Sequence, residues 1–229
     1  MADASVKFDA ASGPEKNEVR DDSEASTGNK VILLGMSGVG KTSLFLRIKD
    51  GQFNSDTTNI RTDQAIKKTI QVGQETVEMT LYDSEAGMEY HEKTLTRGYY
   101  RNSDVALLVY SADSIDSVTR LVNCITRVND YAPEATKIVI RNKVDLEDQT
   151  VREHEVSAQI TDVGYTIKYF CSTSALKPSG IDDLLLKIGK IILKKMREPV
   201  PVEPTINRFD SFRAGQTQPT DTANKSTCC

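Results

Sequence analysis

The sequence predicts an α/β fold, with a mostly parallel sheet that carries helices on both faces. Three observations predict it. Short apolar segments alternate along the chain with longer segments whose apolar residues recur at helical spacing. A glycine-rich loop at residues 35–40 joins the first expected strand to the first expected helix. Polar motifs follow the ends of several expected strands, which is where parallel α/β sheets bind their ligands.

The order of the expected elements begins at residue 30. Continuous apolar runs indicate strands buried on both faces, and alternation around Gly73 indicates an antiparallel hairpin. The expected strands are residues 30–34, 67–72, 76–82, 105–110, 137–140 and 165–170. We expect a first helix after residue 43 and a second that runs from the cap Ser114 to about Pro133. A third is expected at about residues 151–160, and the last at residues 178–196.

Charge is concentrated at the start of the chain. Residues 1–29 contain seven acidic and three basic side chains, which accounts for the whole net charge of −4. They hold almost no large apolar residues, so we expect a disordered acidic arm. Residues 30–196 are expected to form the globular domain, and residues 197–229 a flexible tail that begins with closely spaced prolines. The balanced charge of residues 30–229 gives no indication of a nucleic-acid partner.

The glycine-rich loop fits the pattern G-x-x-x-x-G-K-[ST] from Gly35 to Thr42. Between a strand and a helix this pattern is typical of a phosphate site, because backbone N–H groups converge on the oxygens and the helix N-terminus adds positive charge. We expect Lys41 to supply a point charge toward the β- and γ-phosphates and the Thr42 hydroxyl to bind Mg²⁺. The strand and the helix on either side argue against an ordinary glycine-rich turn.

A second motif, Asn142-Lys143-Val144-Asp145, directly follows the expected strand 137–140. The Asp145 carboxylate is suited to accept hydrogen bonds from N1–H and the 2-amino group of guanine, whereas adenine would leave this charge unpaired. Alone, the motif also fits a loop with a helix-capping Asp. Together with Ser174-Ala175-Leu176 after the last strand, it favours a guanine site and disfavours a P-loop kinase or ATPase.

These motifs resemble, in order and spacing, those of the Ras-superfamily small GTPases. The segments around Ser37–Leu44, Tyr99-Tyr100-Arg101 and Leu108-Val109-Tyr110 look most like the Rab branch. The resemblance covers about residues 30–196 and the last two residues. It implies a P-loop G-domain with a six-stranded sheet, binding of GTP and GDP with Mg²⁺, and a role in vesicle traffic. It also implies an exchange factor, a GTPase-activating protein and effectors as partners.

The same resemblance assigns expected roles to individual residues. Asn142 and Asp145 would hold guanine, Lys143 would flank the base, and Ala175 would offer a backbone N–H. Asp83 occupies the strand-end position of the residue that holds Mg²⁺ through water. The full set expected at the nucleotide is Gly35, Ser37, Gly38, Val39, Gly40, Lys41, Thr42, Ser43, Phe53, Gly87, Asn142, Lys143, Asp145, Ser174, Ala175 and Leu176, with Thr42 and Asp83 at the metal.

The two segments that sense the γ-phosphate in the family depart from its pattern. Ile60 stands nineteen residues after Lys41, where the family has a Thr that contacts Mg²⁺ and the γ-phosphate. Thr58 and Thr62 lie two residues to either side as possible substitutes. In the second segment Gly87 is displaced by one residue, and Met88 stands in place of the Gln that orients the attacking water. Glu85 and Glu89 are weak candidates to replace it, so no catalytic residue is assigned.

The chain ends in Cys228-Cys229, which resembles the double-geranylgeranylation site of Rab proteins. Adjacent cysteines at the end of a flexible tail are better placed for lipidation than for packing, and the alternative is a vicinal disulfide. Anchoring would place the protein on the cytoplasmic face of intracellular membranes, with a cytosolic pool. Cys124 and Cys171 stand alone in sequence and are expected in the core of a reduced protein.

Two functions therefore compete. The first is a GTPase that hydrolyses GTP slowly and cycles as a switch with the help of other proteins. The second is a guanine-nucleotide-binding membrane adaptor that is deficient in hydrolysis and does not cycle. The motifs for binding are intact and those for sensing the γ-phosphate are altered, so the sequence favours a Rab-like GTP-binding protein with weak hydrolysis.

Overall fold

The computed structural model describes residues 29–53, 65–84 and 97–198. Six strands form one sheet in the order β2-β3-β1-β4-β5-β6, and of the pairs in it β2–β3 is antiparallel while the others are parallel. The predicted α/β fold with a mostly parallel six-stranded sheet is thus confirmed. The strands are β1 (Asn29–Leu34), β2 (Ala65–Val72), β3 (Glu75–Tyr82), β4 (Val105–Ser111), β5 (Thr136–Asn142) and β6 (Tyr169–Ser172).

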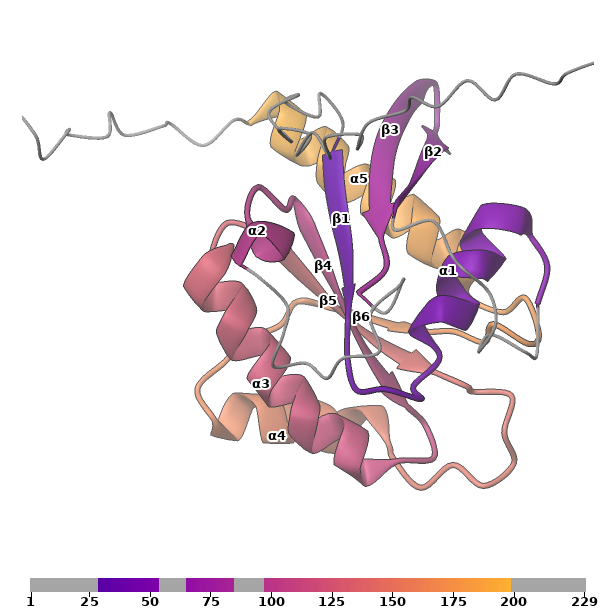
Figure 1. Ribbon diagram of the computed structural model, residues 1–229, viewed down its shortest axis with the longest axis vertical. Coiled ribbons are helices and arrows are strands. Elements are labelled where there is room, and N and C mark those ends of the chain that lie inside the picture. Colours follow the sequence, from indigo (N-terminus) through magenta and orange to yellow (C-terminus); the bar gives the residue numbers. More distant parts are fainter. Residues whose placement is uncertain (1–28, 54–64, 85–96, 199–229) are drawn as a thin grey trace, which may run out of the picture.

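Helices cover both faces of this sheet (Figure 1). Successive side chains of a strand point to opposite faces, and β1 illustrates the result. Val31 and Leu33 join an apolar layer with α1 and α5, while Ile32 and Leu34 join a second layer with α3 and α4. This explains why the central strands are continuous apolar runs. The helices are α1 (Lys41–Asp50), α2 (Arg97–Tyr100), α3 (Ile115–Tyr131), α4 (Glu153–Asp162) and α5 (Ile181–Arg197).

The last strand lies further along the chain than the sequence predicts, so the expected strand at 165–170 is wrong in its bounds. Pairing with β5 begins where Tyr169 meets Ile138, and the strand continues to Ser172. Tyr165 and Ile167 precede it and pack against the apolar layer under α3 and α4. Their alternating apolar pattern therefore reflects packing against the core and not strand pairing.

The last helix begins at Ile181, not at residue 178 as predicted. Gly180 precedes it with a φ of +73°, a left-handed conformation outside the helical region. A Cβ on Gly180 would lie 2.0 Å from the carbonyl oxygen of Ser172, so only glycine fits this position without a shift of the backbone. The turn keeps residues 173–179 free of the helix and close to the end of β6.

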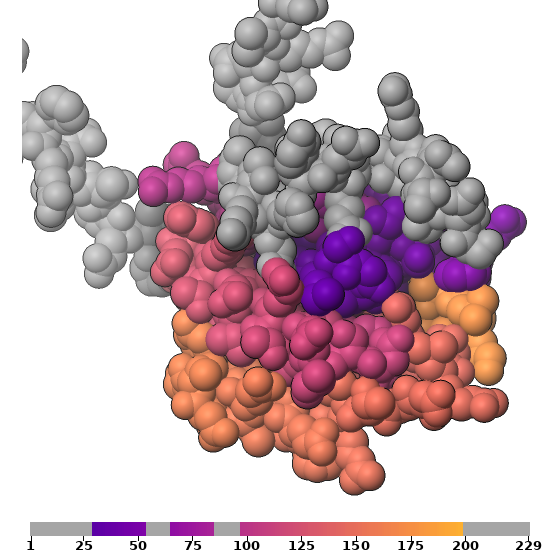
Figure 2. All heavy atoms as spheres, turned by 60° about the horizontal axis from the view of Figure 1, so that its bottom comes forward, coloured from indigo at the N-terminus to yellow at the C-terminus, as the bar shows by residue number. Residues whose placement is uncertain are grey.

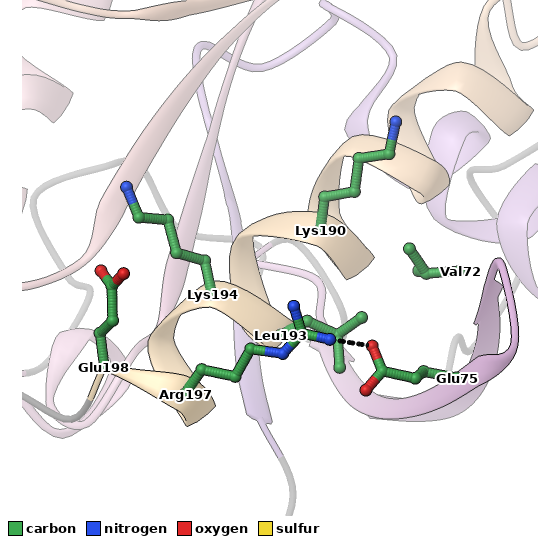
Figure 3. Close-up of a pocket in the computed structure, with 7 residues that line it drawn as sticks. All are labelled: Val72, Glu75, Lys190, Leu193, Lys194, Arg197 and Glu198. Carbon is green, nitrogen blue, oxygen red and sulfur yellow. Dashed lines mark hydrogen bonds and ion pairs between the residues drawn. The ribbon is translucent and has the colours of Figure 1, made fainter.

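A groove with a volume of about 330 Å³ lies between the β2–β3 hairpin and the C-terminal half of α5 (Figure 3). Arg197 forms an ion pair with Glu75 across it. The groove is at the amino end of β3, whereas the predicted ligand motifs follow the carboxyl ends of the strands. It is lined by Val72, Glu75, Lys190, Leu193, Lys194, Arg197 and Glu198.

Cys124 and Cys171 are free thiols buried in the core, as predicted. Within residues 29–53, 65–84 and 97–198, no helix is both long enough and apolar enough to cross a membrane.

Candidate functional site

The glycine-rich loop lies between the end of β1 and the start of α1, and its shape depends on two glycines. Gly35 has a φ of +146°, and a Cβ there would lie 2.2 Å from the carbonyl oxygen of Val109 on β4. Gly40 has a φ of +91°, and a Cβ there would lie 2.6 Å from Nδ2 of Asn142. The loop is therefore pressed against β4 and β5, and the backbone at both positions requires glycine.

Lys41, the first residue of α1, places its charge inside this loop. Its side chain is 1% exposed, and its ammonium donates hydrogen bonds to the carbonyl oxygens of Gly35 at 2.9 Å and Met36 at 2.8 Å. The first turn of α1 holds no acidic residue, so the positive pole of the helix is not offset there. Ammonium, helix pole and glycine backbone together make a site for an anion such as phosphate.

Thr42 and Asp83 meet at the entrance to the same site. The Thr42 hydroxyl donates a hydrogen bond of 2.9 Å to Oδ2 of Asp83, which is 4% exposed and follows β3. A hydroxyl and a carboxylate beside a phosphate site are the hard oxygen ligands that Mg²⁺ prefers. These two side chains therefore fit the predicted magnesium ion.

The Asn142 side chain joins the glycine-rich loop to the loop after β6. It is 1% exposed, its Nδ2 donates to the carbonyl oxygen of Val39 at 2.9 Å, and its Oδ1 accepts a hydrogen bond from the Thr173 hydroxyl at 3.2 Å. Figure 2 views this end of the molecule: indigo atoms from the start of the described chain lie among magenta and orange atoms from later segments. Through Asn142, three segments far apart in sequence are thus joined at this end of the sheet.

Asp145 is held by the loop after β6. The buried Ser174 hydroxyl donates a hydrogen bond to Oδ1 of Asp145 and accepts one of 2.9 Å from the backbone N–H of Lys177. Lys143, two residues earlier, has a left-handed φ of +62°, which turns the chain sharply after β5. The carboxylate therefore has a fixed orientation, as recognition of one base requires.

Comparison with known proteins agrees with this geometry. The profile of the Ras family matches residues 30–194. The GTP-binding protein YPT1 of Saccharomyces cerevisiae is 30% identical over 202 residues, which cover 87% of this chain and 96% of YPT1. The Ras-related protein RABE1e of Arabidopsis thaliana is 30% identical, with 87% and 91% of the two chains covered. The chain belongs to the Ras family. It is a Rab-like small GTPase of the Ras superfamily, as the resemblance predicted.

Of the other residues that the sequence analysis named in this Rab-like chain, some lie in the described part of the structure and the rest lie outside it. Phe53 is partly exposed three residues after the end of α1, and Ala175 is buried while Leu176 is 49% exposed. Ser37 and Gly38 are exposed at the tip of the glycine-rich loop, and Ser43 lies in the first turn of α1. Outside the described residues lie Thr58, Ile60, Thr62, Glu85, Gly87, Met88, Glu89, Cys228 and Cys229.

Tyr99 is a residue whose part in the site the sequence did not reveal. Its hydroxyl lies 3.0 Å from the carbonyl oxygen of Leu33 and 3.2 Å from that of Tyr82. The last residues paired between β1 and β3 are Ile32 and Tyr82, so the hydroxyl bridges the two strands where their pairing ends. Burial, and next the charge of Asp83, raises the pKa of Tyr99, which keeps its hydroxyl protonated and able to donate.

Tyr99→Phe tests this bridge. We expect the free energy of unfolding to fall by about 1 kcal/mol, because two strand-end carbonyls lose their shared donor. Tyr165→Phe is the matched control, since its hydroxyl pairs with the Thr126 hydroxyl at 2.9 Å in an exposed position. Urea unfolding measures both variants. Equal, small effects would show that the Tyr99 hydroxyl does not hold the strand ends.

Proposed function

We propose that this Rab-like protein binds GTP and GDP with Mg²⁺, hydrolyses GTP slowly, and regulates vesicle traffic from the cytoplasmic face of intracellular membranes, with a cytosolic pool. One observation carries the proposal. The Asn142 amide ties the glycine-rich loop to the loop that holds Asp145, so a phosphate site and a base site share one surface. The similarity to the GTP-binding protein YPT1 supports it. Its partners would be an exchange factor, a GTPase-activating protein and effectors.

The phosphates would be held by groups that already converge in the loop. Lys41 contributes a buried ammonium, and α1 contributes its N-terminal pole. A bound Mg²⁺ would neutralise charge on the phosphate oxygens, with Thr42 and Asp83 on its protein side. The protein's own work in this part of the reaction is positioning and electrostatic stabilisation.

The base would be read by Asp145 and the loop after β6. A carboxylate facing N1–H and the 2-amino group accepts two hydrogen bonds from guanine, and adenine offers neither donor in that arrangement. The Ser174 hydroxyl fixes the carboxylate, which reduces the entropy that binding has to offset. Guanine selectivity therefore depends on a preorganised acceptor.

Asp145→Asn tests base selection. We expect weaker GDP and GTP binding and a gain in affinity for xanthine nucleotides, because an amide donates to the 2-oxo group of xanthine where the carboxylate accepted from the amino group. Asp148→Asn, an equal charge change at an exposed position three residues away, is the control. Calorimetric titration with GDP and XDP measures both. Unchanged GDP affinity in Asp145→Asn would overturn the assignment.

The sequence departs from the family pattern at two residues that act in GTP hydrolysis. Met88 has no group with which to orient a water molecule, and Ile60 lacks the hydroxyl that would contact the γ-phosphate side. Lys41, Thr42 and Asp83 keep the electrostatic part of the machinery. The altered residues also support the second candidate, an adaptor that keeps its nucleotide without cycling.

Single-turnover hydrolysis of preloaded GTP tests whether the rate is lowered. A family member with its Gln turns over unaided on the order of 10⁻⁴ s⁻¹, and we expect this protein to be slower. Met88→Gln should raise the rate, with Met196→Gln, 63% exposed near the end of α5, as control. A wild-type rate at or above the family value would contradict the proposal and direct attention to Glu85 and Glu89.

Membrane attachment would depend on two geranylgeranyl groups on Cys228 and Cys229. One lipid chain holds a protein only marginally, so two adjacent chains are needed for stable anchoring. Residues 197–229 carry four basic and four acidic side chains, so they add little attraction to anionic lipids.

Replacing the cysteines in turn tests the anchor. We expect each single Cys→Ser variant to shift the protein from the membrane fraction to the cytosol in part, and the double variant to shift it completely. Thr227→Ala is the control next to the pair. Fractionation of cells after ultracentrifugation gives the distribution. Persistence of the double variant on membranes would identify a protein partner as the anchor.

A further inference from the structure

The guanidinium of Arg47 on α1 contacts the loop that follows β6. Its Nε donates a hydrogen bond of 2.8 Å to the carbonyl oxygen of Ala175, and its Nη2 donates one of 2.9 Å to that of Leu176. Its Nη1 donates one of 2.6 Å to the carbonyl oxygen of Gly51, the cap residue after α1. One partly buried side chain therefore holds two successive peptide groups of the loop against the helix.

We propose that Arg47 is a positioning residue for guanine recognition, which it serves by fixing the peptide groups of residues 175–177. The inference rests on the proposed function, because it concerns how that site reads its base. Arg47 lies on the same helix as Lys41 and Thr42. The contact therefore also fixes the base loop relative to the phosphate site.

Peptide geometry explains how a contact to carbonyl oxygens orients donors. The C=O and N–H of a trans peptide point in opposite directions, so a carbonyl held toward α1 turns the N–H of the next residue away from it. In the peptide between Leu176 and Lys177, the N–H donates to the Ser174 hydroxyl at 2.9 Å on the side opposite Arg47. In the preceding peptide, the Ala175 carbonyl on Arg47 turns the Leu176 N–H away from α1.

The rest of the loop has other restraints, which makes the contribution of Arg47 separable. Ser174 is fixed by Asp145, by the Lys177 N–H and by its own N–H to the Ser179 carbonyl oxygen at 3.1 Å. The side chain of Leu176 is 49% exposed, so it gives the loop little apolar anchoring. The two carbonyls at the loop tip thus depend on the guanidinium, whose planar donors suit a pair of neighbouring acceptors.

The role predicts a specific change in base preference. The Lys177 N–H already donates to the Ser174 hydroxyl, so of these two peptides the Leu176 N–H is the donor left for a ligand. We assign it to the 6-oxygen of guanine, beside the Ala175 N–H that the family resemblance places at the base, since Asp145 would read N1–H and the 2-amino group. Loss of Arg47 should therefore weaken recognition of the 6-oxygen. Recognition of the 2-amino group should persist, because Asp145 keeps its own hydrogen bond from Ser174.

Binding of GDP, 6-thio-GDP and IDP separates these effects. In 6-thio-GDP the 6-position carries sulfur, which is a weak acceptor, and IDP lacks the 2-amino group. In Arg47→Gln we expect the preference for GDP over 6-thio-GDP to fall roughly fivefold, the worth of about one hydrogen bond, and the preference over IDP to stay within about twofold. Arg47→Lys, which keeps the charge and loses the fork, should lie between wild type and Arg47→Gln and serves if Arg47→Gln does not fold.

Lys195→Gln is the matched control. The Lys195 ammonium also joins two loop carbonyls, those of Asp104 at 2.8 Å and Glu134 at 2.7 Å, at the opposite end of the sheet. The base preference of the Lys195→Gln variant should therefore equal that of the wild type. Equal losses for all three nucleotides in the Arg47 variants would overturn the positioning role and leave a purely structural one. A wild-type protein without preference for GDP over ADP would instead refute the proposed function itself.

Discussion

The structure of the site depends on one buried amide. Asn142 is satisfied only when the Val39 carbonyl and the Thr173 hydroxyl lie on either side of it, and leaving a buried polar group unpaired is costly. Gly40 must also lack a Cβ, because an added carbon would meet the same amide at 2.6 Å. One side chain at the end of β5 therefore contacts both the glycine-rich loop and the loop after β6.

Much of this arrangement follows from the rule that parallel strands end at one edge of the sheet. The apolar runs of β1, β4 and β5 were predictable because burial on both faces leaves a continuous pattern. Because these strands are parallel, the motifs that follow their carboxyl ends come together at one edge of the sheet, although Lys41 and Asn142 are about a hundred residues apart in sequence. The 2.9 Å contact of Thr42 with Asp83 agrees with the same rule.

The parts that the sequence did not predict depend on contacts with backbone carbonyls. Tyr99 and Arg47 both bind carbonyl oxygens at strand and loop ends, and a carbonyl is present in every residue, so the pattern holds no signal for such a partner. The bounds of β6 were missed for a related reason. Tyr165 and Ile167 alternate as a strand would, yet pairing with β5 decides where the strand begins.

Binding and turnover rest on different residues in this Rab-like chain. Lys41, Asn142 and Ser174 are buried and hydrogen-bonded: Lys41 closes the glycine-rich loop, while Asn142 and Ser174 join segments far apart in the sequence. Under the proposed function, a substitution there would lower stability as well as nucleotide affinity. The stability of the fold therefore favours keeping these residues, apart from any role in binding. Orientation of an attacking water contributes to the transition state and not to the binding of the ground state, so its loss lowers the rate without lowering affinity. With Met88 in place of the usual Gln, this chain is then expected to keep bound GTP unhydrolysed for longer than an ordinary family member does.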